Sequence, residues 1–147
     1  MNSQGQPVVS VIIPSYQRPK KLREAIGSVL SQTFGNFEVI IVDDGSEPPL
    51  ESVVSSFTDE RIRYIRLEEN RGANVARNTG IEKSNGKFLA FLDDDDRWKN
   101  TKLKRQVKKI QYSEDIGVVY TGQEMVSDNG EKLHKETRTA SRDVIQY

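Results

Sequence analysis

The stretch Lys87–Trp98, with the sequence KFLAFLDDDDRW, carries the pattern that decides the fold. Five consecutive apolar residues, Phe88 to Leu92, run directly into the acidic cluster Asp93 to Asp96. A short apolar run bounded by Gly86 and by charges predicts a strand that is buried on both faces. In open α/β sheets, ligands bind at the carboxyl ends of the strands, which is where this pattern places its carboxylates.

The acidic cluster Asp93 to Asp96 needs a cation nearby. At contact separations and an effective dielectric of about 20, a pair of like charges costs several kcal/mol. A divalent metal relieves this repulsion, and Mg²⁺ and Mn²⁺ prefer oxygen ligands. The alternative is a solvated acidic turn in which Asp96 caps the following helix.

Length and composition exclude several classes of protein. The length of 147 residues fits one domain with its own core. Basic and acidic residues balance at 22 each, so no overall field attracts nucleic acid. Cysteine is absent, which excludes disulfides and thiolate chemistry. No apolar run approaches the roughly 20 residues of a membrane span, and the polar start Met1–Gln6 is no signal peptide. We expect a soluble, cytoplasmic chain that does not bind nucleic acid.

Apolar runs alternate with helical patterns along most of the chain. Strands are predicted at Val8–Ile13, ended by Pro14, at Phe37–Val42, and at Arg61–Leu67. The alternating pattern of the last is typical of a strand with one solvated face or of a strand at an edge. Helical spacing predicts helices over 19–32, 50–57 and 73–83. The last of these has a small-residue face, formed by Ala73, Ala76 and Gly80, which allows it to lie close to the sheet.

The C-terminal part is less regular. Leu103, Val107 and Ile110 predict a helix among the basic residues of 99–109, which form a solvated face or, as the alternative, meet an anionic lipid or polymer. Ile116–Tyr120 predicts a strand, and the turn at 127–130 predicts a hairpin in which 132–137 pairs back. We expect a single domain over residues 1–147, with a core at 8–120 and a hairpin and tail at 121–147.

Strands and helices in this alternation predict βαβ crossovers and a mostly parallel α/β sheet flanked by helices. Two of its strands end in carboxylates, at Asp43-Asp44 and at Asp93 to Asp96. Because the ends of parallel strands meet at one edge, these acids predict a single site.

Five motifs carry a resemblance to a known family. They are VSVIIPSY at 9–16, SVLSQTF at 28–34, FEVIIVDDGS at 37–46, NRG at 70–72 with ARN at 76–78, and FLDDDDRW at 91–98. In this order and spacing, over about 8–120, they resemble family 2 glycosyltransferases of the GT-A fold. The resemblance implies a Rossmann-like GT-A sheet, truncated at the C-terminal side, that binds a nucleotide diphosphate sugar, in the first place a UDP-sugar.

The resemblance also implies roles for residues at the first two strand ends. Pro14, Ser15 and Tyr16 border the nucleoside, and Asp44 accepts hydrogen bonds from the base or the ribose. A carboxylate suits that role because charge-assisted hydrogen bonds are about twice as strong as neutral ones. The alternative for 43–46 is a plain turn, since Asp, Gly and Ser are turn residues.

The Asp-x-Asp motif of the family corresponds to Asp93, Asp94 and Asp95. By the resemblance, Asp94 faces the ribose and Asp95, with Asp93, ligates Mn²⁺ or Mg²⁺. The family more often has a small middle residue, which leaves the assignment open by one position. Arg71 and Arg77 serve the diphosphate together with the amides at 72–73, because a helix N-terminus favours phosphate. For Arg77 the alternative is an ion pair with Asp43 or Asp44.

The implied chemistry is displacement at an anomeric carbon by an acceptor hydroxyl, on a saccharide or a lipid-linked acceptor, with inversion. Inversion needs a carboxylate base, which the family carries beyond the Asp-x-Asp motif. We therefore expect a fragment that lacks its catalytic base, binds the donor without transferring it, sits in the cytoplasm or peripherally at the membrane, and tends to self-associate.

Two other classes compete with this interpretation. A non-catalytic nucleotide-sugar-binding module would have the same site without transfer. A response-regulator receiver also gathers acids at strand ends, but its acidic pair follows the first strand, where this chain has Pro14-Ser15.

Overall fold

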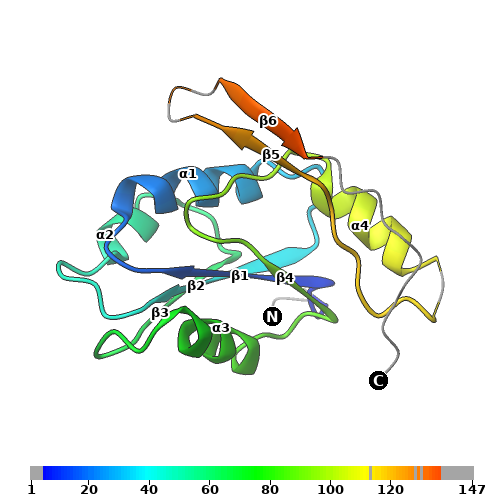
Figure 1. Cartoon of the computed structure of the whole chain (residues 1–147). Helices are drawn as coiled ribbons and strands as arrows, with labels where there is room; N and C mark the ends of the chain where they lie inside the picture. The colour runs from blue at the N-terminus through cyan, green and yellow to red at the C-terminus, as the bar shows by residue number, and fades with distance from the viewer. Residues whose placement is uncertain (1–4, 113, 128, 130, 137–147) are drawn as a thin grey trace. The chain divides into compact units, whose positions relative to one another are not determined.

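The computed structural model describes residues 5–112, 114–127, 129 and 131–136 (Figure 1). The chain divides into two compact units, residues 1–105 and 106–147. Among the described residues, no helix has the length and apolar composition that crossing a bilayer requires.

The first unit is built on a four-stranded sheet whose strands are all parallel, in the order β3-β2-β1-β4. The strands are β1 (Val9–Ser15), β2 (Phe37–Asp43), β3 (Ile62–Arg66) and β4 (Phe88–Phe91). The connecting helices are α1 (Pro19–Leu30), α2 (Glu51–Val54) and α3 (Ala73–Glu82). Helices α1 and α2 lie on one face of the sheet and α3 on the other (Figure 1). The predicted parallel α/β sheet flanked by helices is confirmed.

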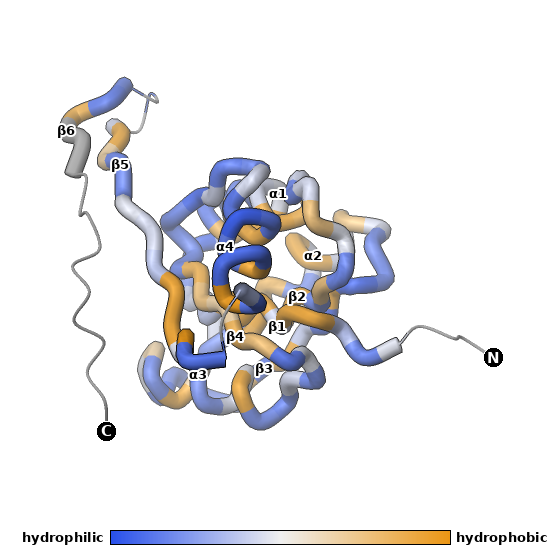
Figure 2. The backbone as a smooth tube through the Cα atoms, turned by 90° about the vertical axis from the view of Figure 1, so that its right-hand side faces the viewer, coloured by the Kyte–Doolittle hydropathy of each residue, from blue (hydrophilic) through white to orange (hydrophobic). Residues whose placement is uncertain are grey.

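The core lies along the two central strands, where every residue of β1 and β2 is buried. Hydrophobic residues gather around these strands in the interior (Figure 2). Ile40 and Val42 of β2 pack with Ala76 of α3 on one face. The run of β-branched residues explains this position, because such side chains pack well on a pleated surface with both faces covered.

The prediction that Pro14 ends the first strand is wrong, because β1 continues through Pro14 to Ser15. Proline lacks an N–H, so it is tolerated only where no ladder bond is required. Ile12 accepts a hydrogen bond from Leu92 on the β4 side, and Ser15 accepts one from Asp44 on the β2 side. Successive residues of a strand direct their backbone polar groups to alternate neighbours, so the nitrogen of Pro14, like the carbonyl of Ile12, faces β4. The pairing with β4 ends at Ile12 and Phe91, two residues before Pro14. No ladder bond is lost there.

Strand β4 is not buried on both faces, which corrects the prediction from its apolar run. Leu89 is 42% exposed and Phe91 is 47% exposed, while Phe88 and Ala90 are half-buried. The reason is the strand order: among the described residues β4 pairs with β1 alone and forms an edge of the sheet. β3 forms the other edge, one of the two positions that its alternating pattern predicted.

Helix α3 lies close to the sheet because its inner positions are small. Ala76 and Gly80 are buried, and a Cβ placed on Gly80 would lie 2.5 Å from Cγ2 of Ile12 in β1. The third small residue, Ala73, is exposed instead, at the start of the helix.

The second unit contains an antiparallel hairpin of β5 (Gln123–Val126) and β6 (Lys132–Glu136), as predicted. Thr137 and the turn residues 128 and 130 lie outside the described residues. The predicted strand at Ile116–Tyr120 is wrong, since these residues form no strand and Val118 is 75% exposed. A strand needs a partner, and the described residues pair none with it. Helix α4 (Lys102–Ile110) starts well after Asp96, so Asp96 does not cap it.

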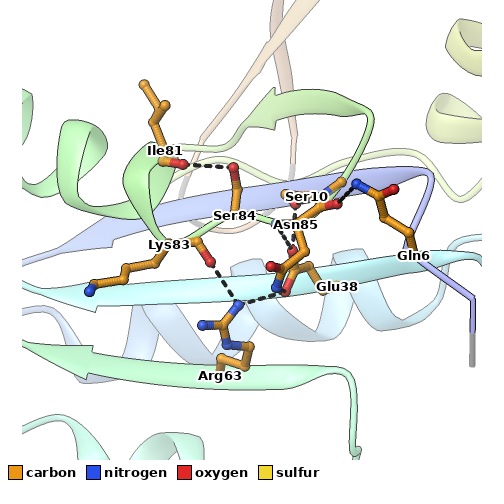
Figure 3. A network of polar contacts seen from close by, with 9 residues as sticks. Gln6, Ser10, Glu38, Arg63, Ile81, Lys83, Ser84 and Asn85 are labelled. Carbon is orange, nitrogen blue, oxygen red and sulfur yellow. Dashed lines mark hydrogen bonds and ion pairs between the residues drawn. The ribbon is translucent and has the colours of Figure 1, made fainter.

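A buried carboxylate ties the amino ends of the strands together. Glu38 of β2 accepts hydrogen bonds from Ser10 Oγ at 2.6 Å, from the Asn85 amide at 2.6 Å and from Arg63 Nη1 at 2.9 Å (Figure 3). Arg63 also donates to the Lys83 carbonyl at 2.8 Å. Burial alone would raise the pKa of Glu38, but these hydrogen bonds and the Arg63 charge outweigh it and lower the pKa. The network holds the loop between α3 and β4 against the sheet.

We expect Gly80→Ala to lower the free energy of unfolding by about 1–3 kcal/mol, because the added methyl group overpacks against Ile12. Gly27 in α1 is the matched control, since a Cβ there meets nothing within 4 Å. Gly27→Ala should stabilise the protein by about 0.5–1 kcal/mol. Urea unfolding of both variants measures the two effects, and equal shifts would contradict the close packing of α3.

We expect Glu38→Gln to cost about 1–3 kcal/mol at pH 7, because an amide NH₂ would face the donors of Arg63 and Asn85. The folded pKa of Glu38 lies below its unfolded value of about 4.3, so its contribution is present above that pH. It is lost as the pH falls through the folded pKa.

Urea unfolding at pH 7 and at acidic pH measures the difference in unfolding free energy between wild type and Glu38→Gln. This difference should shrink on acidification. Glu24→Gln is the control, because that carboxylate is largely exposed and pairs with Arg97 at 3.5 Å. A difference between wild type and Glu38→Gln that is independent of pH would refute the assignment.

Candidate functional site

A groove of about 510 Å³ lies at the carboxyl ends of the parallel strands. The strand order reverses between β1 and β4, and such a switch point is where open α/β sheets bind ligands. The groove collects every predicted site residue except Arg71. Its lining residues are Pro14, Ser15, Tyr16, Gln17, Arg18, Asp44, Ala73, Arg77, Asp93, Asp94 and Asp95.

The end of β1 forms one wall of the groove. Ser15 is buried, and its hydroxyl donates a hydrogen bond to Asp94 Oδ2 at 2.7 Å. Tyr16 is 42% exposed. Gln17 has a left-handed φ of 57° and its amide donates to Ser46 Oγ at 2.9 Å. This bond fixes the backbone of the turn that leads from β1 into α1.

Asp43, at the end of β2, has a structural role. It is fully buried and accepts hydrogen bonds from the Ser46 amide at 2.9 Å, the Leu50 amide at 3.0 Å and Tyr64 Oη at 2.6 Å. Burial alone would raise the pKa of Asp43, but these bonds outweigh it and lower the pKa. For Asp43 the turn interpretation is therefore the right one. Gly45 is required next to it, because φ is 73° and a Cβ would lie 2.4 Å from the Glu69 carbonyl carbon.

Asp44 lines the groove but also holds the start of α3. It is 3% exposed, and its two oxygens accept hydrogen bonds from the Arg71 and Gly72 amides, both at 2.8 Å. The Gly72 amide, which we had expected to meet a diphosphate, therefore faces this carboxylate. A buried charge needs such partners. Each carboxylate oxygen can accept a second bond, so Asp44 retains capacity for a ligand.

The acids after β4 are paired with arginines. Arg18 Nη1 lies 3.1 Å from Asp94 Oδ1 and 3.0 Å from Asp95 Oδ2. Arg77 Nη2 lies 2.6 Å from Asp93 Oδ1. Two guanidinium groups therefore offset part of the charge of the acidic cluster. Arg77 pairs with neither Asp43 nor Asp44, the partners of the alternative interpretation.

Sequence reasoning missed Arg18. It sits at the N-cap position of α1, and Asp94 is the main cause that raises its already high pKa. One signal was available: Arg18 lies in the loop after β1, beside the switch point of the sheet. The sequence could not show which acids it meets, because β1 and β4 are far apart along the chain.

The acidic residues suit a hard divalent cation in one mode of binding. Among the described residues, no group of three or more His, Cys, Asp or Glu side chains is arranged to hold a metal ion. Mg²⁺, however, is usually bound by one or two carboxylates together with substrate phosphates. Asp95 and Asp93 are 44% and 52% exposed at the side chain and provide such oxygens. The residues fit a cation that arrives with a phosphate ligand.

A parallel sheet with a groove at its switch point is typical of Rossmann-like α/β proteins, which bind their ligands there. The family model Glycosyl transferase family 2 matches residues 10–144, and the chain belongs to this family.

Two curated relatives support the assignment. The chain is 39% identical over 132 residues to the Bacillus subtilis protein named "Putative teichuronic acid biosynthesis glycosyltransferase TuaG", with 88% of this chain and 52% of the relative covered. It is 37% identical over 122 residues to the UDP-Glc:alpha-D-GlcNAc-diphosphoundecaprenol beta-1,3-glucosyltransferase WfgD of Escherichia coli, with coverages of 83% and 48%. The chain thus spans about half the length of these relatives.

A solved structure shares the fold. The mannosyltransferase PcManGT of Pyrobaculum calidifontis, in complex with GDP-Man and Mn²⁺, superposes with a TM-score of 0.66 at 26% identity. The match covers 72% of this chain and 33% of that protein. The expected GT-A fold is confirmed.

We expect Asp44→Asn to destabilise the protein by about 1–3 kcal/mol, because one of the two amides that it binds would face an NH₂ group. Asp95→Asn is the control. Its carboxylate is 44% exposed, and a substitution there should stay within about 0.5 kcal/mol. Urea unfolding compares the two variants, and equal stability of Asp44→Asn and wild type would argue against the buried bonds.

Proposed function

We propose that this chain is the donor-binding part of a glycosyltransferase that transfers a sugar from a metal-bound nucleotide diphosphate sugar to an acceptor hydroxyl. The observation that carries the proposal is the groove, which brings Asp44, just after β2, together with Asp93, Asp94 and Asp95, which follow β4. The GDP-Man and Mn²⁺ bound to the similar structure support a donor of this class.

The nucleoside would lie along the end of β1. Pro14, Ser15 and Tyr16 would border it, and Asp44 would accept hydrogen bonds from the base or the ribose. Asp94 would face the ribose, with its carboxylate oriented by the Ser15 hydroxyl at 2.7 Å. We propose uridine as the base, in line with the UDP-Glc donor in the name of the E. coli relative.

The diphosphate and its cation would lie over the Asp-x-Asp motif. Asp95 and Asp93 would hold Mn²⁺ or Mg²⁺, in the mode that uses few carboxylates and the phosphates themselves. Such a cation, when bound, stabilises the negative charge of a departing diphosphate as a Lewis acid. Arg77, which lines the groove from α3, would contact the same phosphates. The side chain of Arg71 is not part of this lining, and its amide supports Asp44 instead.

The acceptor side of the proposed reaction requires a catalytic base. Inversion needs a carboxylate that takes the proton of the acceptor hydroxyl, which contributes about 10²–10⁴ in rate. Glu124 in the hairpin is engaged by Lys132 at 2.6 Å and lies in no recognisable motif. We propose that residues 1–147 alone bind the donor with negligible transfer.

A saccharide or lipid-linked acceptor fits the family. The E. coli relative is named for a diphosphoundecaprenol-linked acceptor, which supports a lipid-linked one here and a peripheral position at a membrane. A cytoplasmic location agrees with a chain that contains no cysteine and needs no oxidising compartment.

The exposed edge of the sheet supports the expected self-association. Leu89 and Phe91 of β4 are exposed together with Ile81 of α3. An edge strand with exposed apolar side chains is a template for pairing with another chain. We propose that a second copy of this chain docks there, which light scattering after size exclusion would detect as a dimer.

The experiment that tests donor binding is a thermal-shift panel of UDP, GDP and their sugars, each with and without Mn²⁺. Mn²⁺ plus UDP should raise the melting temperature more than either alone, because each ligand stabilises the folded state and they share the groove. Asp95→Asn should remove the Mn²⁺-dependent part of the shift. An intact UDP–Mn²⁺ shift in Asp95→Asn would show that the metal assignment is wrong.

The remaining alternative is a non-catalytic nucleotide-sugar-binding module. Transfer by the full-length gene product, assayed with the donor that gives the largest thermal shift, separates the two. Binding without transfer by that product would favour the module, and robust transfer by residues 1–147 alone would overturn the proposed incompleteness.

A further inference from the structure

We propose that Arg18 competes with the divalent cation for the Asp-x-Asp carboxylates and thereby makes metal binding depend on the nucleotide diphosphate. The inference rests on the proposed function of the groove and assigns Arg18 a part in it.

The competition follows from the contacts of one nitrogen atom. Arg18 Nη1 lies between two carboxylates, 3.1 Å from Asp94 Oδ1 and 3.0 Å from Asp95 Oδ2. A divalent cation bound to Asp95 needs its oxygens at about 2.0–2.2 Å and repels a second positive charge beside them. The guanidinium group and a cation therefore compete for the carboxylate of Asp95.

The surroundings allow the side chain of Arg18 to leave while the site stays intact. The side chain is 53% exposed, whereas that of Asp94 is 7% exposed. Asp94 keeps its hydrogen bond from Ser15 when Arg18 departs. The backbone of the turn is held independently by the bond between the Gln17 amide and Ser46. Movement is thus confined to one flexible side chain.

A diphosphate gives the displaced guanidinium a new partner. Arginine forms bidentate hydrogen bonds with phosphate oxygens, and Arg18 lines the same groove as the proposed nucleotide contacts. The diphosphate therefore draws Arg18 away from Asp95 and frees its oxygens for the cation. Because linkage is reciprocal, the cation favours diphosphate binding by the same factor.

Arg77 is less suited to this role. It pairs with Asp93 from helix α3, and its side chain is 32% exposed. Arg18, in contrast, contacts two acids at once: Asp94, assigned to the ribose, and Asp95, assigned with Asp93 to the metal.

The test is a titration of Mn²⁺ followed by the electron paramagnetic resonance signal of the free ion, with and without saturating UDP. Wild type is compared with Arg18→Gln, Arg18→Lys and the control Arg97→Gln. Arg97 is 50% exposed, carries the same charge beside the acidic cluster, and pairs with Glu24 instead.

Without UDP, Arg18→Gln should bind Mn²⁺ at least about fivefold more tightly than wild type, the lower end of typical coupling. The factor by which UDP raises Mn²⁺ affinity should fall accordingly. The Mn²⁺ affinity of Arg18→Lys, which keeps the charge, should lie between those of wild type and Arg18→Gln. The Mn²⁺ affinity of Arg97→Gln should match that of wild type.

Unchanged or weaker Mn²⁺ binding by Arg18→Gln overturns the inference, as does an unchanged UDP coupling factor. An equal gain in Arg97→Gln also overturns it, because the effect would then be one of net charge. If Arg18→Gln does not fold, the intermediate behaviour of Arg18→Lys decides. Failure of the proposed function would give a different result. UDP would then leave the Mn²⁺ affinity of wild type unchanged, and Asp95→Asn would not alter Mn²⁺ binding.

Discussion

The burial of β1 between β2 and β4 is the constraint on which the rest of the structure depends. β1 is buried along its whole length and pairs in parallel with both neighbours. The pairing of β1 with β2 ends at Ser15, opposite Asp43. The pairing of β1 with β4 ends three residues earlier, at Ile12, opposite Phe91. Parallel pairing on both sides therefore delivers the residues that follow all three strands to one edge. The groove residues that follow β1, β2 and β4 lie together because these strands run in the same direction.

Four of the carboxylates at that edge fall into two physical classes. Asp43 and Asp44 are buried and accept hydrogen bonds chiefly from backbone amides, which position loops and the start of α3. Asp93 and Asp95 are about half exposed and contact arginine side chains. Amide partners cannot leave without unfolding the loop, whereas a surface guanidinium is exchangeable. The exposed class is thus the one available to a cation.

A buried carboxylate also anchors the amino ends of the strands. Glu38 joins β1, β3 and the loop before β4 in one buried network (Figure 3). Gly86 belongs to it as well, since its amide donates to Ser10 Oγ at 2.7 Å. Anchoring at this end fixes β4 against β1, so the acids at the far end are placed by a rigid strand.

The sequence by itself determined most of the local elements of the first unit and the location of the acids. The β-branched runs of β1 and β2, the alternation of β3 and the small face of α3 are periodic signals, and periodicity reports which side of an element is covered. Tertiary structure decided what lies next to each residue. The edge position of β4, the tolerance of Pro14, and the pairing of Arg18 with Asp94 and Asp95 all depend on strand order. Strand order joins residues that are distant in the chain, and no local pattern encodes which carboxylate meets which cation.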